Sequence, residues 1–205
     1  SLYRFDHLAR PVKIVPLLAE GMPEVSADFR SWTVKVRRGI YFADDPVFKG
    51  AKRELVAQDY VYSVKRFYDP EVRSPIYQNV KEEGILGLEA LREEALRLKK
   101  PFDYDREVEG VRAIDRYTVQ FRLETPRPRF IYLIAQGGAL GAVAREVIEA
   151  YAGSTMEHPV GTGPFRLAQW RRSSLLVLER NPNFRTVRYE DEVTPLDDDA
   201  EGQAL

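Results

Sequence analysis

The sequence predicts a mixed α/β (α+β) fold in which short antiparallel strands alternate with helices, and three segments carry this prediction. Between residues 117 and 123 apolar and polar residues alternate strictly, as they do in a strand with one buried face. Residues 57–68 instead place their apolar side chains at helical spacing. Residues 165–178 alternate and then turn back, which indicates a second hairpin.

The composition is that of an ordinary globular protein with one large domain or two small ones. Of the 205 residues, 44% are hydrophobic and 31% are charged, and the formal net charge is −1. This balance gives no support for a protein that coats nucleic acid or an anionic membrane. Cysteine is absent, which excludes disulfides and thiolate metal sites. The sequence shows no apolar run of the roughly 18 residues that span a bilayer, and no signal peptide.

The N-terminal part of the chain predicts irregular structure followed by two strands. Pro11 and Pro16 prevent a long regular element in residues 2–20, so we expect an irregular segment packed over a sheet. Residues 23–26 and 32–37 then predict two strands. In the second of them, the side chains that point toward the buried face are Trp32, Val34 and Val36.

Residues 57–68 are the clearest helix in the sequence. Its single apolar stripe contains Tyr60, Val61, Val64, Phe67 and Tyr68. Asp59 lies in the first turn, where a carboxylate interacts favourably with the exposed backbone amides and the positive end of the helix dipole. Asp69-Pro70 ends the helix. Asp44, Asp45 and Asp59 offer the oxygen ligands of a calcium site, but their spacing matches no metal loop, and a solvated loop and helix start are preferred.

The middle of the chain predicts a second helix, a hairpin and two shorter helices. Residues 87–100 form a surface helix whose narrow apolar stripe contains Leu88, Leu91, Ala95 and Leu98. Residues 111–123 predict the hairpin, with its turn at Asp115-Arg116. Residues 130–134 and 142–151 predict the shorter helices.

The C-terminal part of the chain begins with two glycines that flank a threonine, at residues 161–163. Because none of these residues has a large side chain, the main chain there can approach another surface closely or turn through positive φ. A hairpin follows, in which residues 175–178 return as a largely buried strand, and Asn181-Pro182-Asn183 stops it. Seven acidic side chains between residues 190 and 201 indicate a polar, mobile tail.

Several of these segments resemble, in order along residues 14–185, the family 5 extracellular solute-binding proteins, which are the peptide-, dipeptide- and nickel-binding subunits of bacterial ABC importers. The matching segments are LAE at 18–20, WTVKVRRGIYFADD at 32–45, VxAIDxYTVxFxL at 111–123, PVGTGPFRL at 159–167, Trp170, and LVLERNPNF at 176–184. The chain departs from the family pattern at Phe165, where tyrosine is more common, and at Val56, where threonine usually begins the helix. Its loop at 47–54 is also longer than in many members.

The resemblance implies a partial lobe of a type II periplasmic-binding-protein-like fold that carries an inserted subdomain. Residues 1–30 and 160–189 are then part of the core of the first lobe, and residues 31–159 are the inserted subdomain. Residues 190–205 are the acidic tail. The second lobe would be absent, together with the acidic residue that pairs there with a peptide's amino terminus, and the leader would lie upstream of Ser1.

The function that the resemblance implies is the capture of a solute in the periplasm, without catalysis. The protein would bind an oligopeptide or a related small solute, in a Gram-negative bacterium, and deliver it to the permease subunits of an ABC importer. It would meet the membrane only through that permease. The resemblance implies no cofactor, no metal ion and no nucleic acid, and it leaves the identity of the ligand to the second lobe.

The resemblance also indicates where a ligand would be contacted. Tyr77 follows a Ser-Pro pair after the first helix and would lie along the backbone of a bound peptide, with Gln78 behind it. Gly161, Thr162 and Gly163 would offer main-chain contacts, because their small side chains allow close approach. Two plainer interpretations stay open: Tyr77 packs on the preceding helix, and the Gly-Thr-Gly segment does no more than begin the hairpin.

A catalytic centre is hard to assemble from this sequence, so we expect no enzyme. Histidine occurs only at His7 and His158, no serine lies in a nucleophile elbow, and no phosphate-binding loop is present. The glycines within 137–141 resemble a dinucleotide turn, but they follow a helical segment where that turn needs a strand. A hydrolase with a carboxylate pair and a plain protein-interaction module remain as alternatives.

Overall fold

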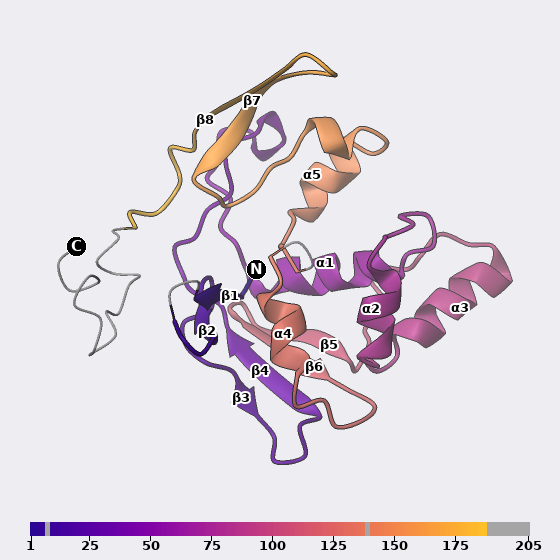
Figure 1. Ribbon diagram of the computed structural model, residues 1–205. Helices are drawn as coiled ribbons and strands as arrows, with labels where there is room; N and C mark the ends of the chain where they lie inside the picture. Colours follow the sequence, from indigo (N-terminus) through magenta and orange to yellow (C-terminus); the bar gives the residue numbers. More distant parts are fainter. Residues whose placement is uncertain (7–8, 138–139, 188–205) are drawn as a thin grey trace.

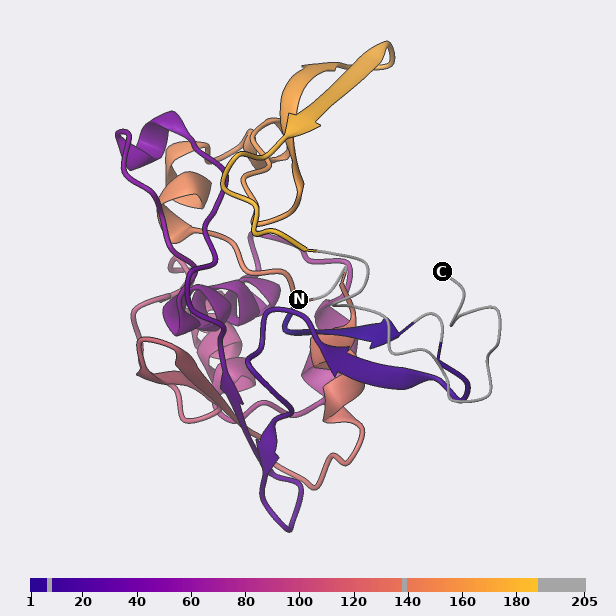
Figure 2. The same cartoon turned by 90° about the vertical axis from the view of Figure 1, so that its left-hand side faces the viewer.

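A computed structural model describes residues 1–6, 9–137 and 140–187 of the chain. A four-stranded antiparallel sheet, in the order β3-β4-β6-β5, is its largest sheet. Figure 1 shows helices α1 to α4 gathered around this sheet, with α5 and the β7–β8 hairpin beyond them. Figure 2 shows the same hairpin standing clear of the rest of the molecule.

The four-stranded sheet confirms the predicted strands and the predicted central hairpin. Its strands are β3 (Glu24–Val25), β4 (Ser31–Lys35), β5 (Val111–Asp115) and β6 (Thr118–Arg122). Trp32 pairs with Phe121 across β4 and β6, and both side chains are buried. Phe130 covers them, with its ring centroid 5.7 Å from that of Trp32 and 5.3 Å from that of Phe121. The alternation therefore buries one face of the sheet, as the sequence pattern predicts.

Helix α1 (Ala57–Tyr68) has the predicted bounds and packs against β5 and β6. Its buried stripe contains Tyr60, Val61, Val64 and Tyr68. Helices α2 (Tyr77–Glu82) and α3 (Leu88–Leu98) lie against α1. The predicted stripe of α3 is wrong at its last position, because Leu98 is 42% exposed. The helix ends at that residue, and the left-handed Lys99 turns the chain away.

The N-terminal segment is more regular than predicted. It forms a hairpin of β1 (Tyr3–Asp6) and β2 (Lys13–Pro16), in which Tyr3 pairs with Pro16. The prolines fit this hairpin because Pro11 lies in its loop and Pro16 is the last residue of its second strand. The hairpin packs against helix α4, whereas the sequence predicts packing over a sheet.

Helix α4 (Phe130–Ala135) agrees with the prediction, whereas α5 (Arg145–Ala150) is shorter than the predicted 142–151. Residue Ala144 keeps an extended backbone, with φ −77° and ψ 123°, and the helix begins after it. Two 3₁₀ turns flank this region, η1 (Pro46–Phe48) and η2 (Thr155–Glu157), and α5 packs on η1.

The C-terminal hairpin consists of β7 (Phe165–Arg171) and β8 (Leu175–Arg180), which pair only with each other among the described strands. The predicted burial of residues 175–178 is wrong, because Leu176 is 59% exposed and Leu178 is 54% exposed. No other described strand joins the two-stranded β7–β8 sheet. No described element packs against both faces of this sheet. Residues 186–187 form no strand, and the predicted tail at 190–205 lies outside the described residues.

Candidate functional site

The Gly-Thr-Gly segment (residues 161–163) is held through the carbonyls of its two glycines, and its amides bond to none of the described residues. The Ala43 N–H donates to the Gly161 carbonyl at 2.8 Å, and the Asn181 side-chain amide donates to the Gly163 carbonyl at 2.8 Å. Within the described part of the chain, the three N–H groups of the segment donate to no acceptor. The segment therefore presents main-chain donors while its position is fixed by other contacts.

Neither glycine of this segment is required by the packing of the described chain. A methyl group built on Gly161 or Gly163 would meet no atom within 4 Å, and neither residue has the positive φ that favours glycine. Gly110 shows the opposite case, because a methyl group there would lie 2.2 Å from the Leu86 carbonyl oxygen. The open space at Gly161 and Gly163 supports a close approach by something other than the described residues.

Two asparagines behind the hairpin hold the segment in place. Asn181 is buried, and besides bonding Gly163 it accepts the Asn183 N–H at 3.0 Å. The Asn183 amide donates to the Phe42 carbonyl at 3.0 Å and to the Asp44 carboxylate at 2.7 Å. From the sequence, Asn181-Pro182-Asn183 is predicted only to end a strand. The signal for the further role is the pair of short amides two residues apart, which bond readily to nearby main chain.

Tyr151 lies next to this arrangement at the end of α5. Its hydroxyl bonds the Asp45 carboxylate, 3.0 Å from Oδ1 and 3.3 Å from Oδ2. Its ring stacks on the His158 imidazole at 3.8 Å and 5°. Burial, and then the hydrogen bond to Asp45, raise the pKa of the Tyr151 hydroxyl, so the tyrosine stays protonated and donates to the carboxylate. The His158 side chain is exposed.

Tyr77 and Gln78 open α2, which Figure 1 shows beside α3 and away from the β7–β8 hairpin. The Tyr77 hydroxyl bonds the Glu89 carboxylate at 2.7 Å and 2.8 Å, and its ring lies under the Arg92 guanidinium at 4.1 Å. The ring also meets Tyr68 of α1 edge to face, with centroids 5.8 Å apart. Contacts with the preceding helix α1 and the following helix α3 together hold Tyr77, while Gln78 is exposed.

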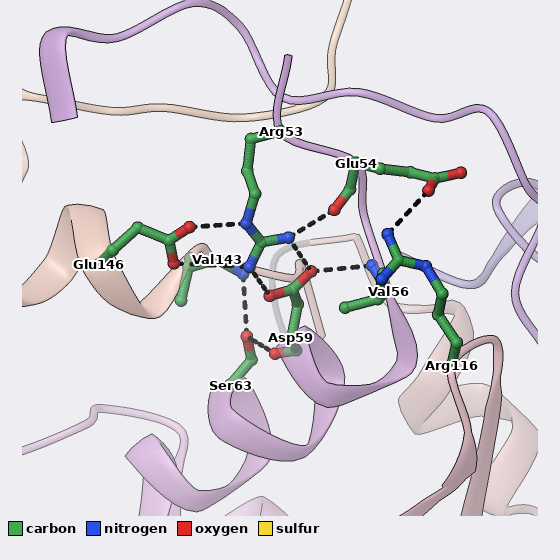
Figure 3. Close-up of polar contacts among 8 residues, drawn as sticks. All are labelled: Arg53, Glu54, Val56, Asp59, Ser63, Arg116, Val143 and Glu146. Atoms are coloured by element: carbon green, nitrogen blue, oxygen red, sulfur yellow. Dashed lines mark hydrogen bonds and ion pairs between the residues drawn. The ribbon is translucent and has the colours of Figure 1, made fainter. Parts of the chain in front are cut away.

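A polar cluster that sequence analysis missed connects the start of α1 to α5 (Figure 3). Arg53 donates to both carboxylate oxygens of Asp59, at 2.6 Å and 3.0 Å. It also donates to the Glu146 carboxylate, with its Nε 2.6 Å from Oε1. Asp59, the third residue of the helix, in turn accepts the N–H of the N-cap residue Val56 at 2.8 Å, which is one half of a capping box. The cluster joins residues 93 positions apart in the sequence.

Asp59 lies in the first turn of α1, as predicted, and it is buried there. Its side chain is only 4% exposed, because Arg53 and Glu146 lie over it. Burial raises the pKa of the Asp59 carboxyl. Burial alone would lower the pKa of the Arg53 guanidinium, but the hydrogen bonds to Asp59 and Glu146 raise it. The guanidinium therefore stays charged and compensates the buried carboxylate.

The same cluster reaches the chain just before α5 through Ser63. The Ser63 hydroxyl donates to the Asp59 carbonyl at 2.6 Å and accepts the Val143 N–H at 2.9 Å. At the other edge, the Glu54 carboxylate accepts from Arg116 at 3.1 Å. Figure 3 shows Glu146 beside the Arg53 guanidinium and Ser63 below Asp59. Loop 47–54, which the sequence marks as an unusually long loop, ends in this cluster.

An apolar groove of about 720 Å³ lies between α5 and the β7–β8 hairpin. Its walls include Val147 of α5, Val160 next to the Gly-Thr-Gly segment, and Trp170 and Leu178 of the hairpin. Within residues 1–6, 9–137 and 140–187, no three His, Cys, Asp or Glu side chains gather where they could hold a metal ion. None of the helices in these ranges has the length and apolarity needed to cross a membrane.

Comparison with known proteins identifies related chains. The family model described as bacterial extracellular solute-binding proteins, family 5 (middle), matches residues 13–201. The di/tripeptide-binding protein 2 of Pseudomonas aeruginosa is 28% identical over 200 residues, which are 90% of this chain and 35% of that protein. The periplasmic oligopeptide-binding protein OppA of Escherichia coli is 31% identical over 160 residues, which are 77% of this chain and 26% of OppA.

A solved structure shows the same relationship. The murein tripeptide binding protein MppA of Escherichia coli matches with a TM-score of 0.70 and 27% identity, over 89% of this chain and 32% of MppA. The chain thus spans about a quarter to a third of the length of these relatives.

Proposed function

Because the chain belongs to the family 5 bacterial extracellular solute-binding proteins, we propose that it supplies part of the first lobe of the substrate-binding component of an ABC-type importer. The matches confirm the predicted mixed α/β fold as that of a partial lobe in this family. In this proposal residues 1–30 and 160–189 belong to the lobe core, and residues 31–159 form the inserted subdomain. A second lobe, outside residues 1–205, closes on the ligand.

The proposed ligand is a peptide or a related small solute, captured in the periplasm and delivered to a membrane permease. The relatives support this class, since one is named for di- and tripeptides, one for oligopeptides and one for a murein tripeptide. OppA is also named as periplasmic, which supports the same compartment for this chain in a Gram-negative bacterium. We extend these properties to the chain as a proposal.

The single observation that carries the proposed site is that the N–H groups of residues 161–163 donate to no acceptor among the described residues. An extended peptide exposes carbonyl oxygens that need donors once water is removed. The Gly-Thr-Gly segment offers such donors, while its own carbonyls are bonded to Ala43 and Asn181. The open space at both glycines lets a peptide backbone come close. Capture then needs no reactive side chain, and the peptide leaves unchanged.

A protein-interaction module is the second candidate, and the exposed hairpin favours it. The apolar side chains of β8 are 37–59% exposed, namely Leu175, Leu176, Val177 and Leu178. An apolar surface of this kind commonly meets a protein partner. Under the first proposal, by contrast, the hairpin is an element of the lobe core and its ligand is a small solute.

An experiment on the complete product of the gene that encodes this chain separates the candidates. The purified protein is stripped of ligand by mild unfolding, refolded, incubated with a mixed peptide library and passed through a desalting column. Mass spectrometry then identifies whatever remains bound. We expect peptides of unchanged mass at a one-to-one ratio. Cleaved peptides would support a hydrolase, and the absence of bound peptide would contradict peptide capture.

A further inference from the structure

Helix α5 is fastened at both ends by side chains from other parts of the molecule. In its first turn, Glu146 accepts from the Arg53 Nε at 2.6 Å. Just before that turn, the Val143 N–H is bonded to Ser63 of α1. At its C-terminal end, Tyr151 bonds the Asp45 carboxylate. A helix of six residues is far too short to be stable alone in water, so these contacts decide where it lies.

The contacts at the C-terminal end lead directly to the Gly-Thr-Gly segment. Asp45 follows Ala43 and Asp44 in the chain, and Ala43 donates to the Gly161 carbonyl at 2.8 Å. Asp44 accepts from the Asn183 amide at 2.7 Å. On its other side, the Tyr151 ring stacks on His158, three residues before Gly161. Tyr151 therefore touches both chain segments whose hydrogen bond fixes the Gly161 carbonyl.

The contacts at the N-terminal end connect α5 to the rigid part of the fold. Arg53 is held by Asp59, whose side chain is buried under it at the start of α1. Helix α1 packs on the four-stranded sheet, so a fixed Glu146 transmits the position of that sheet to α5. The mutual geometry of Arg53, Asp59 and Glu146 is visible in Figure 3.

We propose that Glu146 and Tyr151 are positioning residues, which act through α5 to hold the Gly-Thr-Gly segment in the geometry that receives ligand main chain. This inference rests on the proposed function for the presence of a ligand. The contacts that connect Glu146 and Tyr151 through α5 to the Gly-Thr-Gly segment do not depend on that function. Neither side chain needs to touch the ligand. Each restricts the motion of segments 43–45 and 158–163. The main-chain N–H groups of residues 161–163 are then already in position when the ligand binds.

The test measures amide exchange and peptide affinity in the complete gene product. Tyr151→Phe removes the bond to Asp45 and keeps the ring stacked on His158, and Glu146→Gln weakens the bond to Arg53. Glu149→Gln is the matched control, because Glu149 lies on the same helix and pairs only with Arg145, one turn away, in the described chain. Exchange of the Ala43 amide, which is bonded to Gly161, reports directly on the segment.

We expect the Ala43 amide to exchange about tenfold faster in Tyr151→Phe and in Glu146→Gln, with amides in the middle of α1 unchanged. Peptide affinity should fall by a similar factor in both variants, and Glu149→Gln should match the parent in both measurements. Asp45→Asn, which keeps an oxygen to accept from Tyr151, should lie between the parent and Tyr151→Phe.

Two results would overturn this inference. One is an unchanged Ala43 exchange rate in both variants. The other is a uniform rise across all protected amides, which would mean that Glu146 and Tyr151 contribute only general stability. Because exchange is measured without peptide, these outcomes are independent of the proposed function. A parent protein that binds no peptide would instead contradict the proposed function while leaving the exchange test intact.

Discussion

Arg53 donates to the Asp59 carboxylate through both terminal nitrogens of its guanidinium, at 2.6 Å and 3.0 Å. Arg53 precedes α1 in the sequence, whereas Asp59 lies in the first turn of that helix. The Asp59 side chain is 4% exposed and that of Arg53 is 24% exposed, so the pair is largely shielded from water. Such a pair is costly to break from one side, because the remaining charge stays buried.

Arg53→Met should therefore lower the free energy of unfolding by about 3 kcal/mol, measured by urea denaturation. Arg116→Met is the control, because Arg116 is 62% exposed and its pairing with Glu54 resembles a surface ion pair. That variant should change the unfolding free energy far less than Arg53→Met does. Equal losses in the two variants would show that burial of the Arg53–Asp59 pair is not what matters.

For Tyr60 we expect removal of the hydroxyl to raise the free energy of unfolding, whereas the change at Arg53 lowers it. Its ring is fully buried, and its hydroxyl has no hydrogen-bond partner among the described residues. Removing an unsatisfied hydroxyl relieves a desolvation cost, so Tyr60→Phe should stabilise the protein by up to about 1 kcal/mol. Tyr68→Phe is the matched variant, because the buried Tyr68 hydroxyl donates to the Val80 carbonyl at 3.2 Å.

Tyr68→Phe should lose about 1 kcal/mol in the same thermal or urea unfolding experiment. A loss in Tyr60→Phe as large as the loss in Tyr68→Phe would mean that the Tyr60 hydroxyl has a partner after all.

Glu54 makes stability depend on pH in the acid range. Its carboxylate accepts from the Gly39 N–H and the Tyr117 hydroxyl, each at 2.9 Å, and from Arg116. The hydrogen bond from Gly39, which outweighs the effect of burial, and those from the two side chains hold the pKa of Glu54 below its ordinary value of 4.5. A carboxyl with a lowered pKa stabilises the folded state above the unfolded pKa, and this contribution disappears as pH falls through the folded value.

The parent should therefore be more stable than Glu54→Gln at pH 7, and this difference should shrink as the pH falls below about 4.5. Urea unfolding of both proteins at a series of pH values measures it. A difference that stays constant down to pH 3 would contradict the assignment of charge-dependent contacts to Glu54.

The glycines of the Gly-Thr-Gly segment can be tested apart from stability. A methyl group at Gly161 or Gly163 meets no described atom, so either change to alanine should alter the unfolding free energy by less than about 1 kcal/mol. The same change should weaken peptide binding by about tenfold or more, because the methyl group occupies space reserved for ligand main chain. Gly21→Ala is the control, since its surroundings are equally open. Unchanged affinity in all three variants would remove the segment from the site.

The sequence predicts α1 and the central hairpin well because local patterns dictate them. Asp69-Pro70 stops α1 where the structure ends it, and the alternation from Val119 to Leu123 buries the inner face of β6. The turn at Asp115 needs only neighbouring residues. In each case the information lies within a few positions of the residue concerned.

Long-range relationships could not be predicted in this way. The residues around Asp59 in the sequence do not indicate that Arg53 and Glu146 together cover its side chain. Arg53 and Glu146 are 93 positions apart, so no local pattern contains both. The partnership of Tyr151 with Asp45 spans 106 positions. The apolar run at 175–178 shows that a strand can be buried, but burial also requires a covering surface, which the described chain does not supply for Leu176 and Leu178.

We propose that residues 1–205 hold part of one lobe of a protein that encloses its ligand between two lobes. One lobe leaves the ligand half open, so the entropic cost of binding is met by only part of the contacts. Titration calorimetry with a mixed peptide library tests this claim on the chain alone and on the complete gene product. We expect residues 1–205 alone to bind peptide with millimolar or weaker affinity and the complete gene product to bind it far more tightly. Micromolar affinity in residues 1–205 alone would contradict it.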